Sequence, residues 1–189
     1  MIYKVIGILV ILAWFFYVYT RQPKEGRVSL LLCLIAMAIG AFPVFFAAFF
    51  FQIYSSAYLL KLIPDFLVRI AFSCFVLIAF SEEGFKFLAS RFLARKYNRK
   101  IDYIVIFASV ATGFELFESF YQMEDLISMI IRCVFATHIA MQIIMADFYY
   151  QKKTVFALLI PVLLHGFLDF AIWDFWVCSI SRISRILIC

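Results

Sequence analysis

The chain has 189 residues, of which 67% are hydrophobic and only 15% are charged, whereas a typical soluble domain is about half apolar and a quarter charged. A soluble fold cannot bury this much apolar surface, so the composition excludes an ordinary soluble domain and predicts a protein that lies in a lipid bilayer. The net charge of +5 comes mostly from bases in short loops, without the aromatic and basic interleaving of a nucleic-acid surface, so we expect no nucleic-acid partner.

Six stretches of the chain are long and apolar enough to cross a bilayer, which takes roughly 20 residues. We therefore expect an all-α fold, a polytopic membrane helical bundle of about six transmembrane helices that forms a single integral membrane domain over residues 1–189. The predicted spans are 2–19, 28–51, 66–90, 103–122, 126–150 and 154–177.

These spans divide the domain into three parts. Residues 1–65 hold the first two spans and a connecting segment, after residue 51, that either extends a helix or lies at the membrane surface. Residues 66–177 form a four-helix core of catalytic type, with a polar site in spans three to six. Residues 178–189 form a tail, for which one alternative is a short amphipathic segment on the membrane surface.

The loop charges predict how the chain crosses the membrane. Lysine and arginine gather in the first, third and fifth loops, for example at Arg27, Arg99 and Lys153. Loops of this kind face the cytoplasm, so six spans place both termini outside a cell membrane. Lys4 and the arginines of the tail oppose this orientation.

Span three contains three ionisable residues, Glu82, Glu83 and Lys86. A charge at the bilayer centre costs about 2.5–3.5 kcal/mol on insertion scales, so such residues usually face the protein interior and serve its function. Either glutamate is close enough along a helix to pair with the lysine. The alternative is a salt-bridged helix end, with Lys86 extending to the membrane surface.

Span four contains Glu115 and Glu118, which are three residues apart and share one helix face. Arg132, about two turns into span five, is expected to pair with one of them as structural support. Gly113, on the same span, is expected to let two helices approach closely.

Both histidines of the chain fall inside predicted spans, His138 in span five and His165 in span six. Asp169 follows His165 by four residues on the same helix face, where its carboxylate can orient the imidazole. Gln142 follows His138 at the same spacing and is a candidate supporting residue. Spans three to six therefore each supply ionisable side chains to one candidate site.

Four motifs, in order and each on its own span, resemble the PrsW family of intramembrane proteases: Glu82-Glu83-x-x-Lys86, Gly113-Phe114-x-x-x-Glu118, a lone His138, and His165-Gly166-x-x-Asp169. The resemblance covers roughly 80–172. The family is similar to a larger group that includes the CAAX prenyl endopeptidases and bacteriocin-immunity membrane proteins. The CAAX branch usually has histidine where this chain has Glu118, which favours the PrsW branch; Ser119 stands where that branch often has asparagine.

The resemblance implies a membrane-embedded endopeptidase that cleaves a single-pass membrane protein, such as an anti-sigma factor. Peptide hydrolysis needs an activated water, a polarised carbonyl and a proton donor. We expect Glu82 to be the general base, as the first glutamate of the wider family is, with Glu83 as the alternative and Glu118 sharing the water. His165 and His138 would bind the developing oxyanion or donate the proton.

This glutamate mechanism needs no metal or other cofactor, and it places Glu82 and Glu118 at equal depth only if their helices are longer than predicted or tilted. Three alternatives remain open. The first is a zinc-dependent hydrolase in which His138, His165 and a glutamate bind the metal, although the chain has no H-E-x-x-H motif. The second is a proton-coupled transporter or channel, and the third is a non-catalytic, immunity-type binding protein.

Overall fold

The computed structural model describes residues 2–122, 130 and 137–186, and it contains helices but no strand within these ranges. Four helices in the described residues are long and apolar enough to cross a membrane, by length and composition: Ile2–Thr20, Leu30–Leu62, Lys100–Phe120 and Thr154–Ala171. The predicted all-α membrane bundle is therefore confirmed. The third predicted span is helical but carries Arg69, Glu82, Glu83 and Lys86, and the fifth is described continuously only from residue 137.

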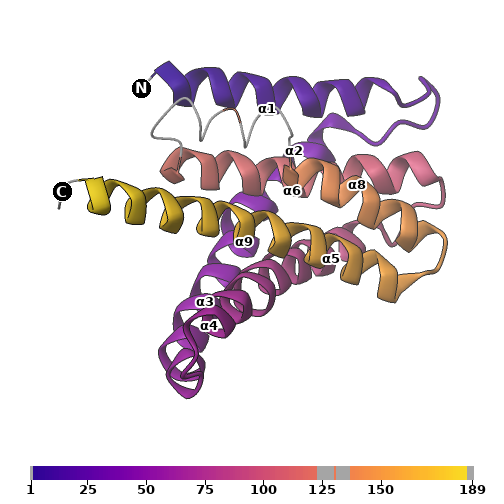
Figure 1. Ribbon diagram of the computed structural model, residues 1–189. Coiled ribbons are helices and arrows are strands. Elements are labelled where there is room, and N and C mark those ends of the chain that lie inside the picture. The colour runs from indigo at the N-terminus through magenta and orange to yellow at the C-terminus, as the bar shows by residue number, and fades with distance from the viewer. Residues whose placement is uncertain (1, 123–129, 131–136, 187–189) are drawn as a thin grey trace.

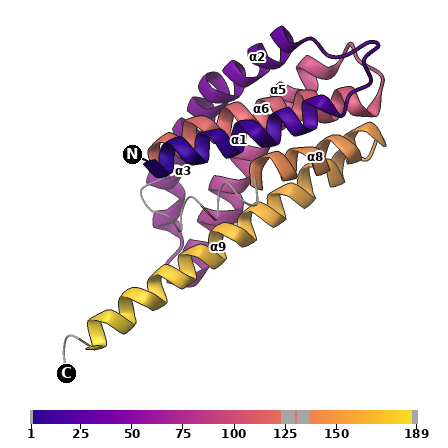
Figure 2. The same ribbon diagram turned by 90° about the horizontal axis from the view of Figure 1, so that it is seen from above.

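The helical elements follow one another with short connections. They are α1 (Ile2–Thr20), α2 (Leu30–Ile39), η1 (Gly40–Val44), α3 (Phe45–Leu59), η2 (Leu60–Leu62), α4 (Phe66–Phe72), η3 (Ser73–Ala79), α5 (Phe80–Ala94), α6 (Lys100–Gln122), α8 (Thr137–Tyr150) and α9 (Thr154–Ile186). α9 continues beyond the predicted end of span six and extends away from the other helices (Figure 2).

Helix α6 is the centre of the bundle, where it contacts α1, α2, α5 and α8. In its most apolar window 78% of the residues are buried, against 22–28% in the other three candidate spans. The largest core cluster joins Phe15 of α1 to Phe107 of α6 and Met145 of α8. Figure 1 shows α3 and α4 leaning away from this centre. The outer helices therefore leave most of their apolar side chains to the lipid.

The second predicted span is longer than expected, because α2, η1, α3 and η2 follow one another without a break from Leu30 to Leu62. Of the two interpretations of the segment after residue 51, helix extension is therefore correct. Pro43 lies in η1, which is a π-helical segment, and proline has no N–H to donate to the preceding turn. The chain turns at Pro64, between η2 and α4. Asp65 caps α4 by accepting the Val68 N–H at 2.9 Å.

The third predicted span is part of a helix that runs through α4, the π-helical segment η3 and α5, from Phe66 to Ala94. It ends four residues beyond the predicted limit at residue 90 and crosses the bundle obliquely (Figure 1). The extra length and the tilt meet the condition under which Glu82 and Glu118 can reach the same depth.

Two glycines, Gly113 of α6 and Gly40 at the start of η1, form the close crossing between α6 and the helix Leu30–Leu62. A Cβ atom on Gly113 would lie 1.9 Å from the Met37 carbonyl oxygen, and one on Gly40 would lie 2.0 Å from the Val110 carbonyl oxygen. Because both obstacles are backbone atoms, only glycine fits at either position. The expectation that Gly113 serves close helix packing agrees with this geometry.

Replacing Gly113 with alanine is expected to destabilise the protein by about 1–3 kcal/mol, because the helices must move apart to admit the methyl group. Gly84→Ala is the matched control, since a Cβ atom there would meet nothing within 4 Å. Alanine favours helix, so the control should be neutral or slightly stabilising. The free energy of unfolding of the two variants, measured in detergent, tests this expectation. Equal values would contradict the close approach of the helices at Gly113.

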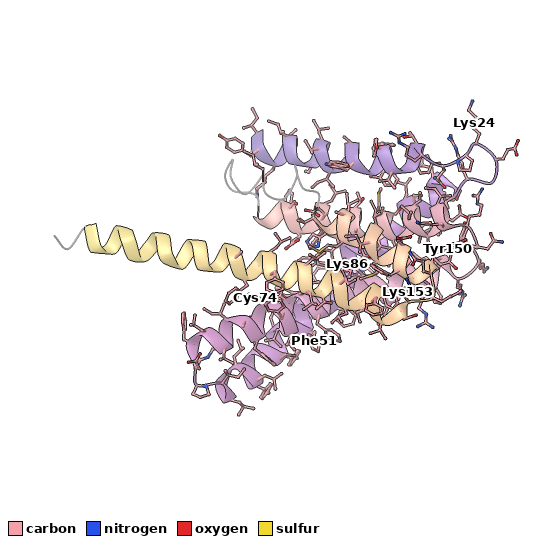
Figure 3. The ribbon with its side chains drawn as sticks, turned by 45° about the vertical axis from the view of Figure 1, so that its right-hand side comes forward. Lys24, Phe51, Cys74, Lys86, Tyr150 and Lys153 are labelled. Atoms are coloured by element: carbon pink, nitrogen blue, oxygen red, sulfur yellow. The ribbon has the colours of Figure 1, made fainter. Side chains whose placement is uncertain are left out.

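The first, third and fifth loops meet at one end of the bundle. Arg99 donates to the Gly26 carbonyl and, at 2.6 Å, to the Asp102 carboxylate, while Lys100 pairs with Asp147 at 2.5 Å. Figure 3 shows Lys24, Tyr150 and Lys153 at this basic end. The loops predicted to face one side of the membrane therefore do lie together.

The N-terminal end of α1 and the C-terminal end of α9 lie at the opposite end of the bundle (Figure 1). Lys4, which opposes the predicted orientation, donates there to the Phe120 carbonyl at 2.6 Å, close to the C-terminal end of α6. A helix C-terminus attracts positive charge, so Lys4 has a structural partner at this end.

Candidate active site

The candidate residues predicted in spans three to six lie together where α5, α6, α8 and α9 meet. All but Asp169 are buried, and they comprise Glu82, Glu83, Lys86, Glu115, Glu118, His138, Gln142, His165 and Asp169. Arg132, predicted to support the glutamates of α6, lies outside the described residues. The site is therefore enclosed by four helices that are far apart in the sequence.

Glu83 is fully buried and both of its carboxylate oxygens are engaged. Oε1 accepts from Lys86 Nζ at 2.6 Å and lies 2.9 Å from His165 Nδ1, and Oε2 accepts from Gln142 Nε2 at 2.9 Å. Gln142 was expected to support His138, which is wrong: its amide bonds to Glu83 instead. With this many partners Glu83 is suited to holding other groups in place rather than to taking a proton from water.

Glu82 differs from its neighbour in having one oxygen without a hydrogen bond. Its Oε1 accepts from Gln52 Nε2 at 3.1 Å, whereas Oε2 is buried and has no hydrogen-bond partner among the described residues. His165 Nε2 lies 3.9 Å from this oxygen. A buried carboxylate oxygen without a partner is costly, which points to a ligand or a reacting molecule at this atom.

His165 lies between carboxylates from two helices. Its Nδ1 is 2.9 Å from Glu83, and its Nε2 is 3.4 Å from Asp169. We expected Asp169 to orient the ring, but the shorter contact is with Glu83 of α5. A carboxylate bound to Nδ1 keeps a proton on that atom, so the lone pair of the ring is on Nε2, on the side of Asp169 and Glu82.

His138 is held on both sides. Lys86 Nζ lies 2.7 Å from Nδ1 and Glu118 lies 2.8 Å from Nε2. An ammonium group can only donate, so Nδ1 accepts and the Nε2–H donates to Glu118. Glu115, fully buried, accepts the backbone N–H of His138 at 3.2 Å. The two glutamates of α6 therefore hold the ring and the backbone of the same residue.

Lys86 is fully buried, and its ammonium lies 4.3 Å from the centre of the Phe114 ring as well as against Glu83 and His138. Figure 3 shows it inside the bundle, away from the lysines of the basic end. The alternative in which Lys86 extends to the membrane surface is therefore wrong. Its charge instead balances that of the buried Glu83.

Three side chains of the site could hold a metal ion. One ligand atom each from Glu82, His138 and His165 lie within 4.8 Å of one another, and all three residues are buried. Two imidazoles and one carboxylate with an open position are the ligands of several zinc hydrolases. The unpartnered Oε2 of Glu82 fits this role. His165 Nε2 would have to exchange its contact with Asp169, and His138 must first release Lys86 or Glu118. The donor set therefore fits zinc.

Gln52 is a site residue that the sequence did not reveal. It lies on α3, outside the predicted four-helix core of residues 66–177, and it contacts Glu82 and Ser81. The available signal was a lone amide within the apolar run Phe45–Ile53, which is weak because glutamine carries no charge.

Comparison with known families agrees with these motifs. The sequence model of a family described as PrsW family intramembrane metalloprotease matches residues 28–187. The match begins at residue 28, where the second predicted span begins, and so extends beyond the range 80–172 in which the motifs lie. No curated protein and no solved structure matches the chain.

Proposed function

The chain belongs to the PrsW family of intramembrane metalloproteases, and we propose that it cleaves a single-pass membrane protein, such as an anti-sigma factor. As a member of this family it is a membrane-embedded peptidase, which is a hydrolase. The observation that supports this substrate class is the burial of Glu82, His138 and His165 among apolar helices. A peptide bond that reaches this cluster has to approach through the bilayer, so its protein is itself a membrane protein. The chain is then a multi-pass protein of the cell membrane.

The proposed mechanism is metal-dependent, with Glu82, His138 and His165 as the residues that hold zinc. The donor set, the unpartnered oxygen of Glu82 and the description of the family all favour a metal. Bound zinc polarises a carbonyl group and activates water for attack. The metal-free mechanism, with Glu82 as the base, is the second candidate, and it is favoured by the two contacts that already occupy both ring nitrogens of His138.

The positions of the reactive side chains are maintained by Glu83. Its Oε1 holds the Nδ1 of His165, and Lys86 and Gln142 hold Glu83 in turn. Ligand histidines commonly bind a carboxylate through their second nitrogen, which keeps the ring in one tautomer and one orientation. Glu83 is therefore a positioning residue in either mechanism.

Glu118 is placed to carry the proton in the metal-dependent mechanism. Its carboxylate accepts from His138 Nε2 at 2.8 Å, and 10% of the Glu118 side chain is exposed. If His138 releases this contact, the Glu118 carboxylate can accept a proton from the attacking water and deliver it to the leaving amine. Asp169, whose side chain is 26% exposed, is the most open carboxylate of the site.

Removal of metal is the first test of this proposal. The purified protein in proteoliposomes is expected to cleave a tagged single-pass reporter, and 1,10-phenanthroline should lower the rate about 100-fold or more, since a catalytic metal supplies several kcal/mol. Added Zn²⁺ should restore cleavage. Unchanged cleavage by metal-depleted protein would instead support the metal-free mechanism.

The same assay distinguishes the remaining alternatives. A transporter, channel or immunity-type binding protein would leave every reporter intact. Proton flux into the liposomes that is lost in Glu118→Gln would then favour transport. Membership of a peptidase family favours hydrolysis over both alternatives.

A further inference from the structure

Gln52 is a polar side chain in one of the most apolar parts of the chain, between Phe51 and Ile53 on α3. An amide in such surroundings is costly unless it forms hydrogen bonds. Its Nε2 lies 3.1 Å from Glu82 Oε1 and 3.3 Å from Ser81 Oγ. The half-buried Gln52 side chain therefore faces the first turn of α5, which contains Glu82 and Glu83.

The chemistry of its partners determines how the amide is turned. A carboxylate accepts hydrogen bonds, so the NH₂ group and not the carbonyl of Gln52 must face Glu82. The Ser81 hydroxyl donates to the Leu77 carbonyl at 2.5 Å, so it too accepts from Gln52. Both contacts thus require the same orientation of the amide.

These bonds have a consequence for the reactive atom of Glu82. The hydrogen bond to Oε1 fixes the rotation of the carboxylate and leaves Oε2 directed toward His165 Nε2, without a hydrogen-bond partner of its own. Without Gln52 the carboxylate could rotate and satisfy Oε2 elsewhere.

We propose that Gln52 is a positioning residue that holds Glu82 so that its Oε2 faces the reacting atoms. Glu83 is held by Lys86 of α5 and Gln142 of α8, inside the four-helix core. The donor to Glu82 comes instead from α3, so the second apolar helix takes part in the site as well as in the scaffold. This inference rests on the proposed function, since it assumes that Glu82 acts in hydrolysis.

The test compares Gln52→Met with wild type in proteoliposomes. Methionine has a similar length and keeps the packing but cannot donate. Loss of a supporting hydrogen bond to a ligand commonly costs 10–100-fold, so kcat should fall by about that factor while KM changes less than about threefold. The affinity of the purified protein for Co²⁺, followed by its absorption spectrum, should fall about tenfold or more for the same reason.

Phe50→Leu is the matched control, because this ring lies on the same helix and is 53% exposed. It should leave both kcat and Co²⁺ affinity unchanged. Gln52→His, whose ring N–H can donate, should recover part of the activity. Should Gln52→Met fail to fold, Gln52→Leu replaces it, and failure of both would assign Gln52 to stability alone and overturn the inference.

Three other outcomes are informative. A folded Gln52→Met protein with wild-type kcat and Co²⁺ affinity would overturn the inference and leave the proposed function intact. A variant that loses only thermal stability would do the same. Wild-type protein that cleaves no reporter would contradict the proposed function, and the inference with it.

Discussion

Glu82→Gln is expected to abolish reporter cleavage, by about 1,000-fold or more, while leaving the fold intact. Both proposed mechanisms depend on the lone pairs of Oε2, either as a metal ligand or as the base, and loss of acid–base chemistry alone costs about 10²–10⁴-fold. The new amide can still accept from Gln52 through its oxygen, and no hydrogen bond of Oε2 is lost because it has none. Initial cleavage rates and thermal unfolding of the same preparation measure the two effects.

Asp147→Asn provides the matched control for this exchange of an acid for its amide. Asp147 pairs with Lys100 at the basic end of the bundle, toward the opposite end of α8 from His138, and its side chain is 35% exposed. The control should cleave at nearly the wild-type rate, because a partly exposed ion pair contributes about 0–1 kcal/mol to stability. If Glu82→Gln kept a tenth or more of the wild-type rate, neither mechanism could stand.

The charged and imidazole residues of the site were predictable from the sequence because of their physical cost. Glu82, Glu118, His138 and His165 lie in spans where an ionisable side chain is unfavourable unless it faces the protein interior. The burial of these side chains in one common site therefore follows from the composition of the spans and the depth of the residues alone. The all-helical fold follows from the same argument, since a helix satisfies its own backbone in lipid.

The pairing of these residues across helices was not predictable. Spacing rules recognise partners on one helix, so they selected Asp169 for His165 and Gln142 for His138. In the structure Glu83 of α5 makes the shorter contact with His165 and accepts from Gln142. Such pairs depend on helix rotation and tilt, which no local pattern specifies.

The role of α3 escaped prediction for two physical reasons. The π-helical segments η1 and η3 change the rotation of α3 and α5, so the faces that meet differ from those of regular helices. Gln52 also carries no charge, and its amide resembles the ordinary polar residues near a helix end. Only its contact with Glu82 distinguishes it.

Lys86→Met is expected to cause the largest loss of stability, about 3–5 kcal/mol, because it leaves the carboxylate of Glu83 buried without its cation. Lys86 and Glu83 are both fully buried and 2.6 Å apart. Methionine has a similar length and can pack against the Phe114 ring, so the loss reports the missing charge more than a cavity. Unfolding by titration with a denaturing detergent measures the change.

A second substitution separates the charge from the position of the lysine. Glu83→Gln combined with Lys86→Met removes both charges. In the wild-type protein Gln142 Oε1 has no hydrogen-bond partner, so the Gln142 amide can rotate and accept from the NH₂ group of the new glutamine at position 83. Removing a whole buried pair is often nearly neutral, so the double variant should recover most of the stability that Lys86→Met loses. Cleavage should not recover, because His138 has lost the donor at Nδ1 that fixes its tautomer. Stability that stays low in the double variant would show that the ammonium serves His138 more than Glu83, whereas recovered cleavage would contradict the positioning role of the pair.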